Sequence, residues 1–204
     1  MSAAAVLSFP TRQPFAFGVL FSTAKTSLAD WMVQRYVEGR QEIDWRRNGA
    51  FAVFGCVYLG GVQYGLYVKL FGRLFPNAEK FALAPIRQKL GDREGMKNLG
   101  AQLFLDQCVH HPLGYFPVFY SVKTCIQGGT ITEAMQTYSR NFRNDMLALW
   151  SIGVPSYFIN FAFSPMWFRV PYVACISLAW TAFMSFRRGE REGHGGGGAS
   201  KQGQ

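Results

Sequence analysis

Three side chains able to hydrogen-bond or exchange protons, Gln102, Asp106 and His110, recur at every fourth residue of one apolar stretch. Residues four apart lie on the same face of a helix, so we expect these side chains to line up. A carboxylate at the centre of a bilayer costs about 2.5–3.5 kcal/mol, so Asp106 must face the protein interior or a wet cavity. The pattern predicts either a polar pathway for solutes or a polar clamp that holds helices in register.

The partner of Asp106 is expected to be a cation. Lys25 and Arg169 are the basic residues nearest the middle of the apolar sequence. A pathway would be lined by Asp106, Gln102, Lys25 and Asn160, the last of which stands between two prolines. The alternative clamp uses the same residues, and the sequence leaves both readings open.

Catalytic and metal-binding motifs are missing from the sequence. His110 and His111 precede Pro112, where we expect a kink, but no second His or Cys cluster lies nearby, so no metal is expected. There is no HExxH motif, phosphate loop, G-x-S-x-G motif or carboxylate pair placed for acid–base catalysis. The sequence therefore predicts a protein that is not an enzyme and has no cofactor.

The elements that position these residues are predicted to be membrane helices. Only 16% of the 204 residues are charged and 49% are hydrophobic, whereas soluble domains carry about 25% charged residues. Crossing roughly 30 Å of hydrocarbon takes about 20 apolar residues in helical conformation. We predict an all-α polytopic membrane helix bundle with four to five hydrophobic helices. The candidate spans are 14–37, 48–68, 98–122, 146–168 and 170–186.

Basic residues concentrate between these spans. The connection 69–97 is predicted to be a basic interfacial loop, with stops at Phe75-Pro76 and Ala84-Pro85 and a short surface helix starting at Pro85. The net charge of +9 thus lies where lipid headgroups would be, rather than along one solvated face. This distribution favours membrane lipids, anionic ones in particular, over nucleic acid as partners.

Turn signals divide the second half of the chain. Gly128-Gly129 is expected to end the third span, and Thr132 to cap a new helix. Pro155, Pro165 and Pro171 are expected to segment the last apolar region.

Gly61 and Gly65 form a GxxxG motif in an uncharged span, and Gly72 extends the same face. Small residues at this spacing let a neighbouring backbone approach closely. We expect these glycines to pack against another helix of the same chain; a dimer contact is the alternative.

The predicted organisation is an N-terminal segment 1–13, a membrane helix bundle 14–188 and a flexible Gly-rich tail 189–204. We expect no secretory signal peptide in the first residues, because they contain no long apolar core.

The spacing of several residues matches a known pattern, W-x-x-W-P-x-x-Q-x-x-N-F-x-x-V-P-x-x-x-R with a later Trp and Ser. The matching residues are Trp150, Asn160-Phe161, Pro165, Arg169, Trp180 and Ser185, with Asp30, Gln34, Tyr67, Asp106-Gln107 and Pro112 in earlier elements. In this order they resemble the family of the twenty-two-kilodalton peroxisomal membrane protein and the mitochondrial inner-membrane protein Mpv-seventeen. Departures from the pattern, such as Tyr157 in place of its Gln, mark this chain as divergent.

The resemblance implies an integral organellar membrane protein, a small-solute channel of the mitochondrial inner membrane. The alternative function is a non-enzymatic accessory subunit of a large inner-membrane complex of the respiratory-chain or ATP-synthase type, with other subunits as partners. Peroxisomal and plastid membranes are the alternative locations. The predicted pathway or clamp residues are Lys25, Asp30, Gln102, Asp106, Gln107, His110, Asn160 and Arg169.

Overall fold

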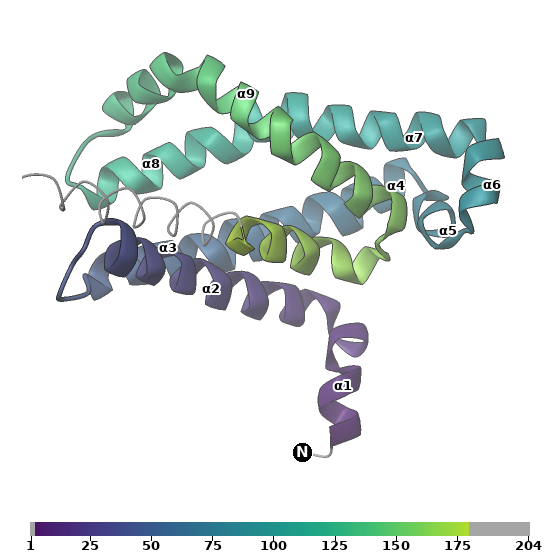
Figure 1. Cartoon of the computed structure of the whole chain (residues 1–204), viewed down its shortest axis with the longest axis horizontal. Coiled ribbons are helices and arrows are strands. Elements are labelled where there is room, and N and C mark those ends of the chain that lie inside the picture. The colour runs from purple at the N-terminus through teal and green to yellow at the C-terminus, as the bar shows by residue number, and fades with distance from the viewer. Residues whose placement is uncertain (1–2, 180–204) are drawn as a thin grey trace, which may run out of the picture.

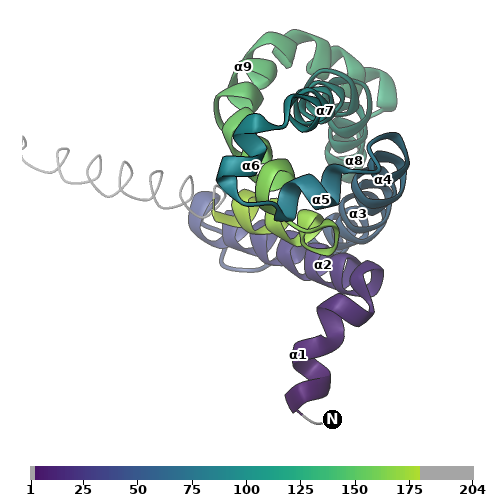
Figure 2. The same ribbon diagram turned by 90° about the vertical axis from the view of Figure 1, so that its right-hand side faces the viewer.

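The computed structural model describes residues 3–179, and the prediction of an all-helical chain is confirmed for them, since they contain no strand. The long helices run along one axis of the molecule and pack side by side (Figure 1). Seen end-on, they surround a common interior, while α1 (Ala3–Arg12) points away from the bundle (Figure 2). The proposed tail 189–204 lies outside the described residues, as does the end of the last predicted span.

Four long helical runs build the bundle, and two short helices connect the second run to the third. The first run is α2 (Pro14–Met32) with η1 (Val33–Val37), and the second is α3 (Trp45–Phe54), η2 (Gly55–Val62), η3 (Gly65–Leu70) and α4 (Phe71–Leu74). The short helices are α5 (Ala78–Leu83) and α6 (Ile86–Gly91), followed by the third run, α7 (Arg93–Phe104), η4 (Leu105–Tyr115) and α8 (Phe116–Ile126). The fourth run is α9 (Ile131–Phe163), and the described chain closes with the turn η5 (Met166–Phe168), which opens the helical segment Met166–Ala179.

The expected stops between 69 and 97 are confirmed, but the expected loop is wrong. Helix α4 ends before Phe75-Pro76, α5 ends before Ala84-Pro85, and α6 begins directly after Pro85. Proline interrupts a helix only locally because it lacks one N–H and clashes with one turn. The residues between these prolines therefore remain helical.

The N-terminus of α9 is capped by Thr130, so the expected cap at Thr132 is wrong by two residues. The Thr130 hydroxyl accepts a hydrogen bond from the Glu133 amide, and the Glu133 carboxylate accepts one from the Thr130 amide. This reciprocal capping box requires an acidic residue three positions after the cap, which Thr130 has. The expected break at Pro155 is also wrong, since α9 continues through it to Phe163.

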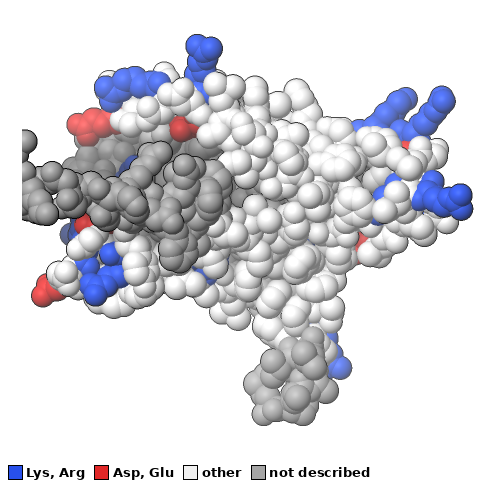
Figure 3. Space-filling model, in the orientation of Figure 1, with Lys and Arg blue, Asp and Glu red and all other residues white. Residues whose placement is uncertain are grey.

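Two helices of the described chain, Trp45–Leu74 and Ile131–Phe163, are long and apolar enough to cross a membrane by length and composition. The surface agrees with an apolar surround: on the face in Figure 3, Lys and Arg gather toward the two ends of the bundle, with an uncharged belt between them. Large side chains such as Leu113 (76% exposed) and Val53 (61% exposed) lie on the outside.

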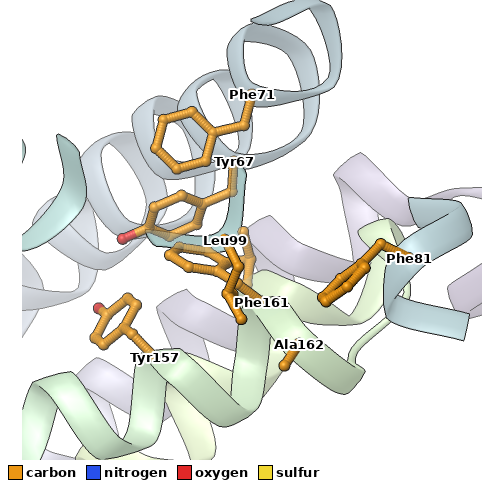
Figure 4. Packing of buried hydrophobic residues seen from close by; sticks show 8 residues of the cluster. Tyr67, Phe71, Phe81, Leu99, Tyr157, Phe161 and Ala162 are labelled. Carbon is orange, nitrogen blue, oxygen red and sulfur yellow. The ribbon is translucent and has the colours of Figure 1, made fainter. Parts of the chain in front are cut away.

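The interior, by contrast, contains many polar side chains. Those with less than a tenth of their surface exposed include Asp30, Gln34, Asn48, Gln63, Gln102, Asp106, Gln107, His111, Asn160 and Arg169. The apolar part of the core is an aromatic cluster in which the Tyr67 and Phe71 rings lie 5.6 and 5.7 Å from the Phe161 ring (Figure 4). Edge-on pairs of this kind stabilise a fold by about 0.5–1.5 kcal/mol each beyond their burial. They fix α9 against the second helical run.

The glycines of the second helical run that pack closely against another helix are Gly55 and Gly60, so the expectation for Gly61 and Gly65 is wrong. A Cβ added at Gly60 would lie 2.6 Å from the Val19 backbone of α2, whereas one at Gly65 would meet nothing within 4 Å. At Gly72 the nearest atom would be a methyl group 3.9 Å away. The reason is the π-helical backbone of η2, whose i→i+5 hydrogen bonds bring residues five apart, rather than four, onto one face.

Candidate functional site

The site is built around η4, where the backbone is again π-helical. With about one residue more per turn than an α-helix, η4 places positions four and five residues on from Asp106 toward the same side. Both His110 and His111 therefore face Asp106, and His111 Nδ1 lies 2.9 Å from the Asp106 carbonyl oxygen. The i, i+4 spacing of an α-helix identifies only His110.

The expected kink at Pro112 does not end the helix, which continues from Leu105 to Tyr115. In a π-helix, proline leaves the carbonyl five residues earlier without its donor. That carbonyl belongs to Gln107, and it accepts a hydrogen bond from Trp150 Nε1 of α9 at 3.3 Å. A tryptophan on the neighbouring helix thus replaces the missing backbone donor.

The Asp106 carboxylate is fully buried and is surrounded by donors. The Tyr67 hydroxyl donates to Oδ1 at 2.7 Å and Gln107 Nε2 donates to Oδ2 at 2.7 Å. His110 Nδ1 lies 3.0 Å from Oδ1, and His111 Nδ1 lies 3.3 Å from Oδ2. Hydrogen bonds to a buried charge compensate for the water it has lost, so this set explains how the carboxylate is accommodated.

The expected cationic partners of Asp106 are therefore wrong: in the described chain neither Lys25 nor Arg169 forms an ion pair with it. Its surroundings are aromatic and imidazole groups instead. Tyr58 hydroxyl lies 3.2 Å from His110 Nε2, and Tyr157 hydroxyl lies 3.4 Å from His111 Nε2. The predicted i, i+4 relation between Asp106 and His110 is present.

A second polar group joins three of the predicted residues. Arg169 Nη1 donates to Gln102 Oε1 at 3.0 Å, and Asn160 Nδ2 donates to the Arg169 carbonyl at 3.1 Å. All three side chains are buried. The group connects α7, α9 and the segment Met166–Ala179, as a clamp would.

Asp30 belongs to a third group, which lies at the end of the α2 run and is separate from Asp106. Its carboxylate accepts hydrogen bonds from Gln34 Nε2 at 2.7 Å and from Arg47 Nε at 2.8 Å, with Asn48 Nδ2 at 3.2 Å. Arg47 also pairs with Glu38. Partial burial raises the pKa of Glu38, but the hydrogen bonds and charges of Arg47 and Arg40 outweigh it, so the net pKa is lowered.

A cavity of about 300 Å³ lies on one side of Asp106. It is lined by His111, which lies 3.3 Å from the Asp106 carboxylate, and by Tyr157, whose hydroxyl lies 3.4 Å from His111 Nε2. Lys25 and Asp145 also line it. Lys25, predicted as a pathway residue, thus faces this cavity rather than Asp106. Most of the remaining lining is apolar.

A second cavity of about 210 Å³ lies between α5, α6 and α7. Its lining is polar and includes Lys89, Asn98 and Gln102. Gln102, which lines this cavity, also accepts the hydrogen bond from Arg169.

The third helical run connects the two cavities. Asn98 and Gln102 line the second cavity, His111 and Tyr115 line the first, and Asp106 lies between them. Gln102 and His111 are nine positions apart along this run. The cavities are thus divided by a short barrier that contains Asp106 and the Tyr67–Phe161 contact.

Asp106, His110 and His111 are also the described side chains with the composition of a metal site, since their ligand atoms lie within 4.8 Å of one another. In the structure His110 Nδ1 is hydrogen-bonded to the carboxylate, and His111 Nδ1 is hydrogen-bonded to the Asp106 carbonyl and lies 3.3 Å from the carboxylate. A metal ion would have to replace these bonds.

Comparison with known proteins gives matches to one family. A family model described as the Mpv17 / PMP22 family matches residues 124–185. The chain is 24% identical over 193 residues to Protein SYM1 of Mycosarcoma maydis, covering 94% of this chain and 85% of that protein. It is 29% identical over 90 residues to Protein SYM1 of Kluyveromyces lactis, covering 44% and 46% of the two chains. No solved structure gives a match.

Proposed function

We propose, from the premise that this chain belongs to the Mpv17 / PMP22 family, that it is a channel which conducts small solutes across an organellar membrane. The observation that carries the proposal is the pair of cavities divided by the barrier at Asp106. A closed channel has this form, with one vestibule on each side of a constriction. The predicted polar pathway is accordingly divided: Gln102 lies on one cavity, Lys25 on the other, and Asp106 in the barrier.

The proposal needs four to five spans, and the structure offers helices for them. Trp45–Leu74 and α9 are long and apolar enough by themselves. The run Pro14–Val37, the run Arg93–Ile126 and the segment Met166–Ala179 lie alongside these helices (Figures 1 and 2). The buried polar side chains and exposed apolar ones support lipid as the surround for the bundle.

Opening such a barrier requires the second and third helical runs to separate locally. The hydrogen bond from Tyr67 to Asp106 joins these runs across the barrier. A neutral amide at position 106 would weaken the bonds from Tyr67 and both histidines, because charge-assisted hydrogen bonds are about twice as strong as neutral ones. Asp106→Asn should therefore favour the open state.

Solute flux from proteoliposomes tests the proposal. We expect wild-type protein to release trapped small polyols at a measurable rate, and Asp106→Asn to release them several-fold faster. Asp30→Asn is the matched control, because it makes the same change at another buried carboxylate that lines neither cavity. Absence of flux from both wild type and Asp106→Asn, or equal flux from all three proteins, would rule out the pathway.

We place the protein in the mitochondrial inner membrane, with peroxisomal or plastid membranes as the alternatives. Family membership supports an organellar membrane, and the basic ends of the bundle suit anionic lipid headgroups. Subfractionation of purified mitochondria, followed by alkaline carbonate extraction, tests both the location and the integral character.

An accessory subunit of a large inner-membrane complex is the second candidate. It is favoured by the open surface beside Gly61 and Gly65, where exposed Val57 and Val62 leave space for a helix of another protein. Blue-native electrophoresis in mild detergent tests it with Gly61→Leu. This reading requires wild-type protein in a large complex and a Gly61→Leu protein released from it; migration of wild type only as a small species contradicts it.

A further inference from the structure

We propose that Arg169 forms a binding site for a small oxyanion, a carboxylate or a phosphate, that arrives through the second cavity. Arg169 has no exposed surface, yet its Nε and Nη2 atoms have no hydrogen-bond partner. Only Nη1 is engaged, by the neutral Gln102 side chain at 3.0 Å. No acidic side chain of the described residues forms an ion pair with it.

An arginine in this state is unusual because buried charges in proteins are normally paired and hydrogen-bonded. The Phe161 ring, with its centroid 5.2 Å from the guanidinium carbon, stabilises the cation but accepts no in-plane N–H bond. Two nitrogen atoms of a guanidinium form a fork that fits a carboxylate or phosphate in bidentate geometry. The unpartnered Nε and Nη2 atoms are two such donors.

The route to Arg169 passes Gln102, which lines the second cavity and holds Nη1. The Gln102 amide also donates to the Asn98 carbonyl at 3.2 Å, and Asn98 lines the same cavity. Rotation of this one side chain would bring the cavity into contact with the guanidinium. Gln102 thus closes the inner wall.

The basic side chains that line the cavity itself are the exposed Lys80 and the buried Lys89. The Nζ atom of Lys89 donates to the Ala82 carbonyl at 2.9 Å and lies 4.2 Å from the Phe163 ring centroid. Burial lowers the pKa of Lys89. The acidic groups on the wall are Asp92, whose carboxylate already accepts the Gly95 amide, and the exposed Glu94.

The size of the cavity limits the ligand. About 210 Å³ corresponds to roughly seven water molecules at about 30 Å³ each. This volume suits inorganic phosphate or a short carboxylic acid, or the phosphate group of a lipid whose chains remain outside. The site names small oxyanions as a solute class for the proposed channel. This link to transport rests on the proposed function, whereas binding at Arg169 does not.

Binding is measured on the purified full chain in detergent, without transport. Thermal unfolding is followed in chloride, inorganic phosphate and succinate at equal ionic strength. We expect phosphate or succinate to raise the melting temperature saturably by several degrees. Gln102→Glu keeps the side-chain shape and places a carboxylate beside Arg169, so it should raise the melting temperature in chloride and abolish the anion-dependent rise.

Gln127→Glu, at an exposed position after α8, introduces the same charge elsewhere and should keep the anion response. A parallel titration with phosphatidic acid in mixed micelles distinguishes a lipid headgroup from the free anion as the source of phosphate. A rise with any of these probes that depends on Gln102 supports the site. No rise with any probe, or an equal rise in Gln102→Glu, overturns it.

The two proposals fail separately. Proteoliposomes that conduct polyols, made from protein with no anion response, would refute the site and leave the channel intact. Anion binding by protein that shows no flux would retain the site and refute the channel.

Discussion

Tyr67 on η3 donates a 2.7 Å hydrogen bond to Asp106 on η4, and this bond joins residues 39 positions apart in the chain. Tyr67 has no exposed surface, and its ring also packs against Phe161. One side chain therefore serves both the polar cluster and the aromatic core. The bond ties the second helical run to the third at the level where the two cavities are divided.

Replacing Tyr67 by Phe should lower the free energy of unfolding by about 1–3 kcal/mol, because a buried charged acceptor loses a donor while the ring stays in place. Denaturation by SDS in mixed micelles measures the change. Tyr157→Phe serves as the comparison, since its longer 3.4 Å contact with His111 should contribute less. Equal effects of the two substitutions would show that the Tyr67 bond has no special weight.

Adjacent glycines in η2 should respond oppositely to alanine. Gly60→Ala should destabilise the protein by about 1–3 kcal/mol, because the new methyl group would overlap the Val19 backbone. At Gly61 the nearest atom would be a carbonyl oxygen 3.6 Å away, so Gly61→Ala should be neutral or gain up to about 1 kcal/mol of helix propensity. The same SDS titration measures both, and a larger loss at Gly61 would contradict the packing described.

The Glu38–Arg47 ion pair should make stability depend on acid pH. Because the pKa of Glu38 is lowered from its ordinary 4.5, its contribution is fully present above about pH 4.5 and is lost as pH falls through the lower, folded-state value. We expect Glu38→Gln to melt below wild type at pH 7, with a loss of at most about 1 kcal/mol in the free energy of unfolding, and this difference to be smaller at pH 3.

The control for this pair is Glu42→Gln, which removes an exposed carboxylate of the same loop that forms no ion pair in the described chain. It should melt like wild type at both pH values. A difference between Glu38→Gln and wild type that is as large at pH 3 as at pH 7 would assign the effect to something other than ionisation.

Chelation should leave the Asp106–His110–His111 group unchanged. The carboxylate is already hydrogen-bonded to Tyr67, Gln107 and His110, and His111 Nδ1 lies 3.3 Å from it, so a metal would have to displace formed contacts. We expect EDTA and added Zn²⁺ to leave the melting temperature within experimental error. A Zn²⁺-dependent rise that disappears in His111→Gln would refute this and identify a metal site.

Much of the helical outline was accessible from the sequence. Apolar stretches with few or no charges located the four long runs, and the prolines at 76 and 85 located the stops, because both signals act through local chemistry. The start at Pro14 and the end at Val37 agree with the structure. The predicted ends of the other runs were less accurate. Helix α9 begins at Ile131, well before the predicted start at 146, because its first turns are polar and carry no apolar signal.

The polar contacts were harder to predict, and the helical period is the reason. An α-helical period of 3.6 residues predicts that His110 faces Asp106 and that Gly61 packs against a neighbouring helix. The π-helical backbone of η4 brings His111 to Asp106 as well as His110. That of η2 places Gly60, instead of Gly61, against α2. Tyr67 and Trp150 were missed as partners because donors from distant helices leave no spacing pattern in one chain. The Asp30–Gln34 bond, at i and i+4, was the more accessible contact.

Because amide and charged side chains lie inside this bundle and apolar ones outside, its tolerance to substitution should differ from that of a soluble protein. In a water-soluble fold, hydropathy identifies the positions most sensitive to mutation, because apolar residues form the centre. Here the outward Leu, Val and Phe positions should accept one another freely, while Gln107 and Asn160 should accept almost nothing. A saturation mutagenesis scan of this bundle would therefore rank its buried amide side chains, rather than its most hydrophobic residues, as the least replaceable.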